Sequence, residues 1–126
     1  MSTDTSPSND RWLYILSRAP FDGANLAEAV DALLVCGVFE RNVSVLIIED
    51  AVQVLRSEQD GQPLGFKTVA KQVTALPDYD VTDIFVCKDS AARAGLAADD
   101  VSLPVEWLDL TAQKDLIATC NAVFSD

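Results

Sequence analysis

The sequence contains no histidine, and this absence excludes several kinds of chemistry. A serine or cysteine nucleophile has no histidine base within the chain. Zinc sites lose their commonest nitrogen ligand, and three widely separated cysteines do not form a metal-spaced cluster. The sequence also lacks a GxGxxG fingerprint and a phosphate-binding loop. We therefore expect neither a metal site nor a cofactor.

Basic residues are scarce. The chain has 9 Lys and Arg against 20 Asp and Glu, which gives a formal net charge of −11. Most of such a surface repels a phosphate backbone, so we expect no direct binding to nucleic acid. The acidity fits a basic protein partner, and it equally fits a protein that is acidic only for solubility.

Cysteine is also sparse, and long apolar runs are missing. Cys36, Cys87 and Cys120 are odd in number and far apart, which argues against a disulfide framework. No apolar run reaches the roughly 20 residues that cross a bilayer. The polar first residues lack the basic and apolar regions of a signal peptide. We therefore expect a cytoplasmic protein with no membrane contact.

The pattern that is present alternates strands with helices. Residues 1–10 read as a disordered N-terminal tail, and residues 11–126 are long enough for one domain only. Apolar runs predict strands, and helical spacing predicts helices. The predicted strands are 12–17, 43–48, 84–87, 105–108 and 122–124, and the predicted helices are 25–39, 66–76, 88–96 and 111–120. This order predicts a single three-layer α/β domain with a largely parallel sheet of about five strands, flavodoxin-like in outline.

Helix ends carry their own signals. Asn25 and Thr111 are predicted to cap the first and last helices, because their side chains can accept hydrogen bonds from free backbone N–H groups. Gly95 is predicted to end the helix 88–96, since glycine adopts the left-handed conformation found at helix C-termini. Residues 51–55 are predicted to form a short helix or turn.

Cys87 is the most suggestive residue for chemistry. It closes a predicted strand, and ligands of parallel α/β sheets gather beyond the carboxyl ends of strands. The following helix directs its N-terminal amides toward this position, and Lys88 and Ser90 are candidates to support a thiolate. A thiolate here could attack a persulfide and carry its sulfur without a histidine base. The alternative is a small buried side chain that only ends a strand.

The other candidates are weaker. Cys36 and Cys120 lie within predicted helices, where a packing role is the simpler interpretation. Glu49 and Asp50 end the second predicted strand, as the acids of phosphate-receiver domains do. A receiver domain needs a phosphoacceptor aspartate at the end of the third strand, and Cys87 stands there instead. That function is therefore excluded.

The order of motifs resembles the DsrF/TusC branch of the DsrE/DsrF-like (DsrEFH/TusBCD) family. An Ala-Pro loop at 19–20 precedes EAVDALL at 28–34, which is similar to the E-x-x-D-x-x-L pattern of the family. EDAVQVL at 49–55 stands where the branch has a D-G-V-F-Q-L type of sequence, with Ala and Gln in place of Gly and Phe. Residues 67–96 resemble the family's most specific stretch, which ends in V-C-x-x-S-x-x-x-x-G-L.

The resemblance implies a subunit of a sulfur-relay complex. Such chains assemble with DsrE/TusD-like and DsrH/TusB-like sister subunits into a heterohexamer that passes persulfide sulfur from donor to acceptor proteins. The sulfur serves 2-thiolation of the tRNA wobble uridine or dissimilatory sulfur metabolism. The sister subunit has its relay cysteine eight residues before a helix-ending glycine, and Cys87 has this spacing before Gly95.

The resemblance also bears on whether the chain is itself a carrier. Cysteines of the DsrF/TusC branch are not regarded as the principal carriers, which implies a mainly structural, non-catalytic subunit. Two alternatives stay open at this point. The first is an active sulfur carrier that uses Cys87, and the second is a homo-oligomeric DsrE-like protein of another function.

Overall fold

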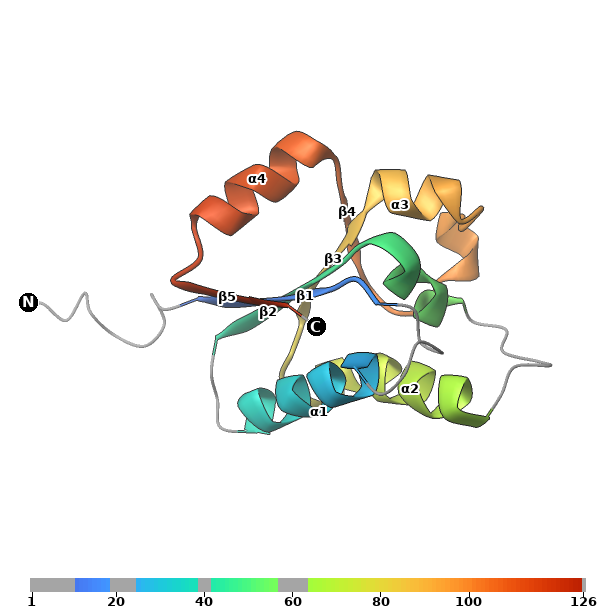
Figure 1. The fold of residues 1–126 in the computed structure, drawn as a ribbon, viewed down its shortest axis with the longest axis horizontal. Helices are drawn as coiled ribbons and strands as arrows, with labels where there is room; N and C mark the ends of the chain where they lie inside the picture. Colours follow the sequence, from blue (N-terminus) through green and yellow to red (C-terminus); the bar gives the residue numbers. More distant parts are fainter. Residues whose placement is uncertain (1–10, 19–24, 39–41, 57–63, 126) are drawn as a thin grey trace, which may run out of the picture.

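The protein folds around a five-stranded sheet in which all neighbouring strands are parallel (Figure 1). The computed structural model describes residues 11–18, 25–38, 42–56 and 64–125. The strands are β1 (Trp12–Leu16), β2 (Val43–Ile47), β3 (Asp83–Cys87), β4 (Glu106–Leu108) and β5 (Ala122–Ser125). Their order is β4-β3-β2-β1-β5. The predicted α/β class and parallel sheet are confirmed.

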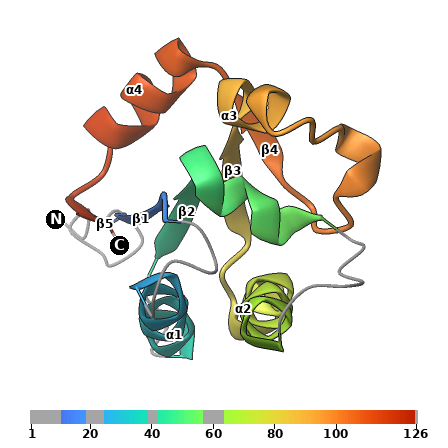
Figure 2. The same ribbon diagram turned by 45° about the vertical axis from the view of Figure 1, so that its right-hand side comes forward.

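Helices lie on both sides of the sheet, so the three-layer prediction is also confirmed. Figures 1 and 2 show α1 and α2 side by side under one face and α4 over the other. The helices are α1 (Asn25–Val38), α2 (Leu64–Thr74), α3 (Lys88–Arg93) and α4 (Leu110–Ala118). Short 3₁₀ helices are η3 (Glu49–Leu55), η4 (Leu76–Tyr79) and η5 (Ala98–Asp100).

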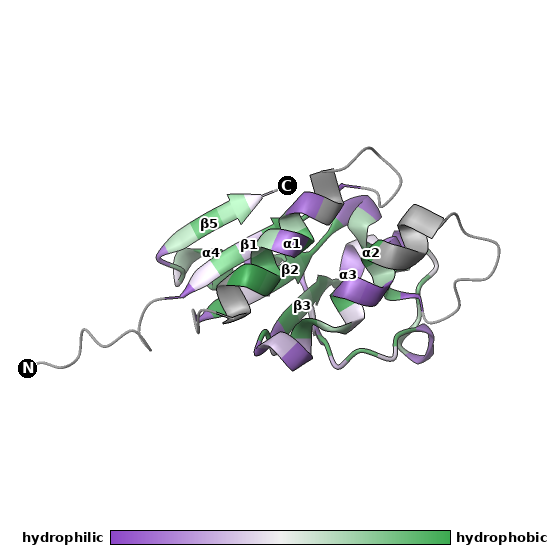
Figure 3. Cartoon of the chain, turned by 90° about the horizontal axis from the view of Figure 1, so that it is seen from below, coloured by the Kyte–Doolittle hydropathy of each residue, from purple (hydrophilic) through white to green (hydrophobic). Residues whose placement is uncertain are grey.

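Alternation along the strands divides the core into two unequal parts. On β1, Leu16 belongs to the large cluster under α1 and α2, whereas Leu13 belongs to a small cluster under α4. All five residues of β2 are buried, as expected for a central strand covered on both faces. Figure 3 shows hydrophobic residues along the inner strands and hydrophilic ones on the helix surfaces. The α4 side therefore has the thinner hydrophobic layer.

The strand order decides what meets at the carboxyl edge of the sheet. Strands β1 to β4 follow one another across the sheet, and β5 returns to lie beside β1. This order differs from the 2-1-3-4-5 order of flavodoxin. Because every pair is parallel, the segments that follow β2, β3 and β4 all begin at the same edge. These segments are η3, α3 and α4.

The predicted cap of the last helix is wrong, whereas α1 begins at Asn25, where the first helix was predicted to start, and the Asn25 side chain lies outside the described residues. The last helix begins at Leu110, and its cap is Asp109, whose Oδ1 accepts a hydrogen bond from the Ala112 N–H at 2.8 Å. Thr111 lies inside the first turn, where its own N–H needs a partner, so it cannot serve as the cap.

Gly95 has the predicted conformation. Its φ is +69°, and the Gly95 and Leu96 N–H groups donate to the Ala92 and Ala91 carbonyls at 3.1 and 2.9 Å. This pair of bonds is a Schellman motif. The helix itself ends at Arg93, three residues earlier than predicted, because Ala94 and Gly95 form the cap.

Some predictions concern parts of the chain that lie outside the described residues. These are the tail 1–10 and the Ala-Pro loop at 19–20. The side chain of Cys36 in α1 also lies outside them. In the part of the chain that the structure describes, no helix has both the length and the apolar character that crossing a membrane requires.

Candidate functional site

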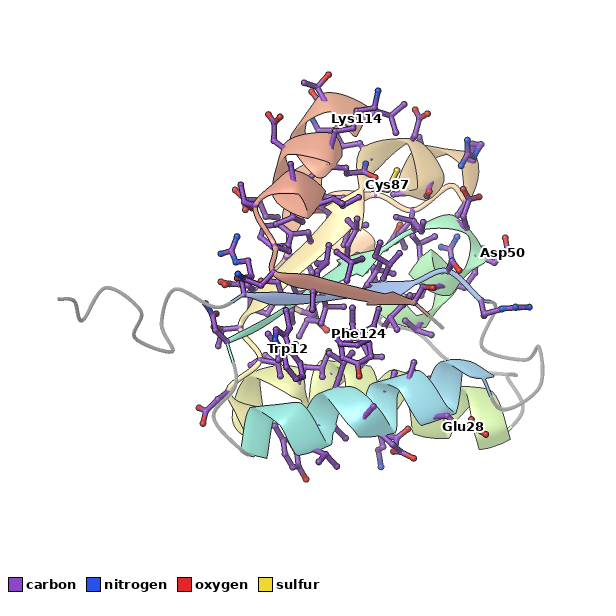
Figure 4. All side chains as sticks on the ribbon, turned by 60° about the vertical axis from the view of Figure 1, so that its left-hand side comes forward. Trp12, Glu28, Asp50, Cys87, Lys114 and Phe124 are labelled. Atoms are coloured by element: carbon purple, nitrogen blue, oxygen red, sulfur yellow. The ribbon has the colours of Figure 1, made fainter. Side chains whose placement is uncertain are left out.

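Cys87 lies at the junction of three elements. It is the last residue of β3, the N-cap of α3, and the register partner of Leu108 in β4. Phe85, two residues earlier on the same strand, packs in the cluster under α4, so Cys87 also faces α4. Figure 4 shows Cys87 on the Lys114 side of the sheet. The residue is only 4% exposed.

Ser90 connects the thiol to the segment after β2. Its backbone N–H donates to Cys87 Sγ at 3.5 Å. The Ser90 Oγ in turn accepts the Glu49 N–H at 2.9 Å and the Arg93 Nη2 at 3.4 Å. Ser90 is 3% exposed, so its polar atoms depend on these partners. The structure therefore brings Cys87 and Ser90 into contact.

Gln113 lies on α4 next to the strand partner of the thiol. Its Nε2 donates to the carbonyl of Leu108, which pairs with Cys87 across β3 and β4, at 3.0 Å. Gln113 is 8% exposed and lies on the inner face of α4 with Leu116. Gln113 was not predicted from the sequence as a residue of the site. The available signal was a polar residue three positions before Leu116 on the apolar stripe of the helix.

The hydrogen bonds decide the protonation of Cys87. Burial by itself raises the pKa of the thiol, because desolvation disfavours the charged form. The Ser90 hydroxyl and N–H, the Gln113 side chain and the Asp89 N–H together outweigh this effect, and the pKa is lowered from its ordinary value. Lys88, which was expected to help, is exposed and lies beside Trp107 in a neighbouring hollow. It is not among the groups that lower the pKa.

The turn after β2 forms the other wall of the site. Glu49 has a φ of +51°, a left-handed conformation that costs free energy in a residue other than glycine. Its carboxylate pairs with Arg93 at 3.5 Å, but both side chains are more than half exposed, so the pair adds little stability. A hollow of about 140 Å³ lies here, lined by Glu49, Asp50, Gln53, Ser90, Arg93 and Ala94.

Cys120 has different surroundings. Its Sγ donates to the Leu116 carbonyl at 3.1 Å within the same helical turn, and the side chain packs in the cluster under α4. Burial raises the pKa of this thiol in spite of the nearby Arg11 charge. Cys120 is therefore held as a neutral packing group. Over the described ranges, no group of three His, Cys, Asp or Glu residues is arranged to hold a metal ion.

Comparison with known proteins shows that the chain is similar to DsrF and TusC proteins. It is 32% identical to the intracellular sulfur oxidation protein DsrF of Allochromatium vinosum, over 91% of this chain and 95% of that protein. It is 33% identical to a TusC homologue of Pseudomonas aeruginosa, over 90% of this chain and 96% of that protein. A TusC homologue of Vibrio parahaemolyticus is 30% identical over 89% of this chain and 95% of that protein.

Solved structures agree on the fold. The crystal structure of the ychN protein from E. coli superposes with a TM-score of 0.74 at 17% identity, covering 93% of this chain and 99% of that one.

The sequence profile of the DsrE/DsrF-like family matches residues 10–125, which is nearly the whole chain. The family that the motifs of the sequence resemble is therefore confirmed: this protein belongs to the DsrE/DsrF-like family.

Proposed function

We propose that this chain is a cytoplasmic subunit of a sulfur-relay complex and that Cys87 carries sulfur in it. Support for the complex comes from the family and from DsrF and TusC homologues that match over almost their whole length. Support for Cys87 comes from its site. The carrying observation is a thiol at the end of β3 that caps α3 and accepts the Ser90 N–H at 3.5 Å, and its pKa is lowered from the ordinary value.

The proposed step is a thiol–persulfide exchange. The Cys87 thiolate attacks the outer sulfur of a persulfide on a donor protein. A bond forms between Cys87 Sγ and that sulfur, and the bond between the two donor sulfurs breaks. The electron pair leaves with the donor cysteine as a thiolate, so no oxidant or reductant is consumed. Ser90 and Gln113 act before the attack, because they stabilise the thiolate that performs it.

A mainly structural role is the second candidate, and one observation favours it. Cys87 is only 4% exposed, so a donor has limited access to the sulfur in the isolated chain. In this role the chain would hold DsrE/TusD-like and DsrH/TusB-like sisters in a heterohexamer, and a sister cysteine would carry the sulfur. In either role the sulfur would serve tRNA wobble-uridine 2-thiolation or dissimilatory sulfur metabolism, without direct contact between this chain and nucleic acid.

Two experiments test these proposals separately. Co-expression with DsrE- and DsrH-like sisters followed by size-exclusion chromatography tests the complex, and recovery of free monomer alone would exclude it. The complex is then incubated with a persulfide donor, and added sulfur is mapped by mass spectrometry. We expect the sulfur on Cys87, its loss in Cys87→Ser, and no change in the Cys120→Ser control. Full loading of the complex in Cys87→Ser would assign the relay to the sisters.

A further inference from the structure

We propose that the outer edge of β5 is a self-association surface, on which a second copy of this chain adds its own β5 in antiparallel pairing. Within the described ranges, β5 is the last strand of the sheet and pairs with β1 alone. Figure 3 shows it as the outermost strand, with an apolar colour. The N–H and C=O groups on the outer side of an edge strand are a template for another strand. The inference goes beyond the proposed function and does not depend on sulfur carriage at Cys87.

The side chains of β5 are exposed on both faces of the sheet. Val123 is the register partner of Leu13, which packs under α4, so Val123 lies on the α4 face, and it is 44% exposed. Phe124 lies on the opposite face, where its ring stacks on Tyr14 with 5.1 Å between the centroids, and it is 38% exposed. Figure 4 shows Phe124 beside Trp12 on the α1 side of the sheet. Apolar surface therefore continues around this edge from one face to the other.

The other edge of the sheet differs in the features that prevent pairing. β4 begins with the charged Glu106, and Pro104 lies two positions before it. Charged residues and proline are common means of blocking an edge strand. β5 has the sequence Ala-Val-Phe-Ser and contains neither. Its neighbour β1 has no charged residue either. Of the two edge strands, β5 is therefore the one suited to pairing.

Charge favours an uncharged strand as the occupant. A basic strand would find no acid to pair with in β5 or β1, although the chain as a whole carries a net charge of −11. An acidic strand would be repelled by that net charge. The β5 strand of a second copy is itself uncharged, so it can join this edge without burying an unpaired charge.

Antiparallel pairing about a twofold axis at Val123 gives complementary contacts. An axis perpendicular to the sheet keeps the α4 face on the same side in both copies, so opposite residues lie on the same face. With the two Val123 side chains opposite each other, Phe124 of each copy lies opposite Ala122 of the other. Ala122 is the register partner of Trp12, so the Phe124 ring meets a small residue next to an aromatic one.

The size of the contact sets its strength. A strand of four residues contributes far less than the roughly 20–30 residues a side of a standard protein interface. We therefore expect a weak dimer that dissociates on dilution. Both copies are strongly acidic, so salt should strengthen the association by screening their repulsion. Binding of a basic partner would weaken with salt.

Disulfide trapping in the full-length chain tests both the pairing and its register. In Val123→Cys the two new thiols lie opposite each other, with Cα atoms about 4.5–5.5 Å apart, a separation that a disulfide spans. Ser125→Cys is the matched control, because it is exposed on the same strand but its two copies would lie about 14 Å apart. After mild oxidation, peptide mapping should find the symmetric disulfide in Val123→Cys alone. Equal trapping of both variants would indicate random collision and overturn the proposal.

A charge at the twofold axis should weaken the dimer. Val123→Lys places two like charges opposite each other, at a position exposed enough to leave the core intact. Sedimentation velocity should show association at least about tenfold weaker than in wild type. Leu110→Lys makes the same change of charge at an exposed apolar residue of α4, and this control should associate as wild type does.

Other results would contradict the pairing. A wild-type chain that stays monomeric at every concentration would overturn it, as would equal weakening in Val123→Lys and Leu110→Lys. Trapping of Val123→Cys only to a sister subunit in the co-expressed complex would assign this edge to a different partner and overturn the second copy. Val123→Cys also covers the case in which Val123→Lys does not fold. Persulfide loading is measured separately, so failure of the proposed function leaves these results unaffected.

Discussion

Replacing Ser90 by alanine should change both the free energy of unfolding and the Cys87 pKa. The Ser90 side chain interacts with the Glu49 backbone and with the thiol. The Oγ accepts the Glu49 N–H at 2.9 Å, the Ser90 side chain is among the groups that lower the Cys87 pKa, and the residue is 3% exposed. Ser90→Ala leaves the Glu49 N–H without this acceptor at a position where the backbone is already left-handed. We expect a lower free energy of unfolding and a higher Cys87 pKa.

The size of the loss follows from the contacts. A partly buried N–H that loses its partner costs about 1–3 kcal/mol. Alanine recovers roughly 0.5 kcal/mol because it is the better helix former within α3. The net loss is about 1.5 kcal/mol, and for a chain of this length a loss of 1 kcal/mol lowers the melting temperature by about 4 °C. The expected decrease in melting temperature is therefore about 6 °C.

The assay combines thermal unfolding with the pH profile of Cys87 alkylation. Ser102→Ala, an exposed serine outside the site, is the control and should change neither quantity. A Ser90→Ala protein with wild-type melting temperature would show that the Glu49 N–H finds water at no cost. A wild-type alkylation midpoint in the same variant would show that the Ser90 hydroxyl does not act on the sulfur, and would refute the site described above.

Three further predictions concern caps and pH. Gly95→Ala should lower the free energy of unfolding by about 1 kcal/mol, because a φ of +69° strains a residue that has a Cβ. A steric clash does not contribute, since the added Cβ meets no atom within 4 Å. Urea unfolding measures the loss, and Gly95→Asn should lose less because asparagine tolerates this conformation better. Asp109→Ala should cost about 1 kcal/mol in the same assay, whereas Thr111→Ala should cost almost nothing, and the reverse result would restore the cap predicted from the sequence. The Cys87 pKa is lower in the folded state, so the folded chain binds fewer protons than the unfolded one between that pKa and the ordinary value. The difference in unfolding free energy between wild type and Cys87→Ser should therefore grow as pH rises through this window and disappear below it, and a difference that shrinks with rising pH would contradict the lowered pKa.

The sequence alone was sufficient to predict those strands and helix ends that have a local sequence signal. The buried strand β2 is almost entirely apolar and was predicted within one residue of its end, because burial on both faces leaves no room for alternation. Gly95 was predicted because a left-handed helix end has a specific residue requirement. Thr111 was predicted as the cap, whereas Asp109 takes that place; both residue types suit a cap, and only the packing of α4 on the sheet decides where its first turn begins.

The site was only partly predictable for a related reason. Ser90 follows Cys87 at a spacing that a helix N-terminus makes meaningful, so the pair could be found from the sequence. Glu49 binds Ser90 and Gln113 binds Leu108, both from segments far from Cys87 in the chain, and only the strand order brings them to the site. No local pattern in a single sequence predicts that β3 lies between β2 and β4. Lys88, the sequence neighbour with the favourable charge, lines a hollow with Trp107 and is not among the groups that lower the Cys87 pKa.

The acidity of the chain makes these neutral donors more important. A net charge of −11 opposes a thiolate anywhere on this protein, and each surface carboxylate raises the pKa of a nearby thiol. Those charges are mostly exposed, however, and salt screens them beyond about 10 Å. The Ser90 N–H is buried within hydrogen-bond reach of the sulfur, where water does not weaken its interaction in the same way. Short-range hydrogen bonds therefore prevail over long-range repulsion, which explains how a strongly acidic chain without histidine can still hold an ionisable thiol at Cys87.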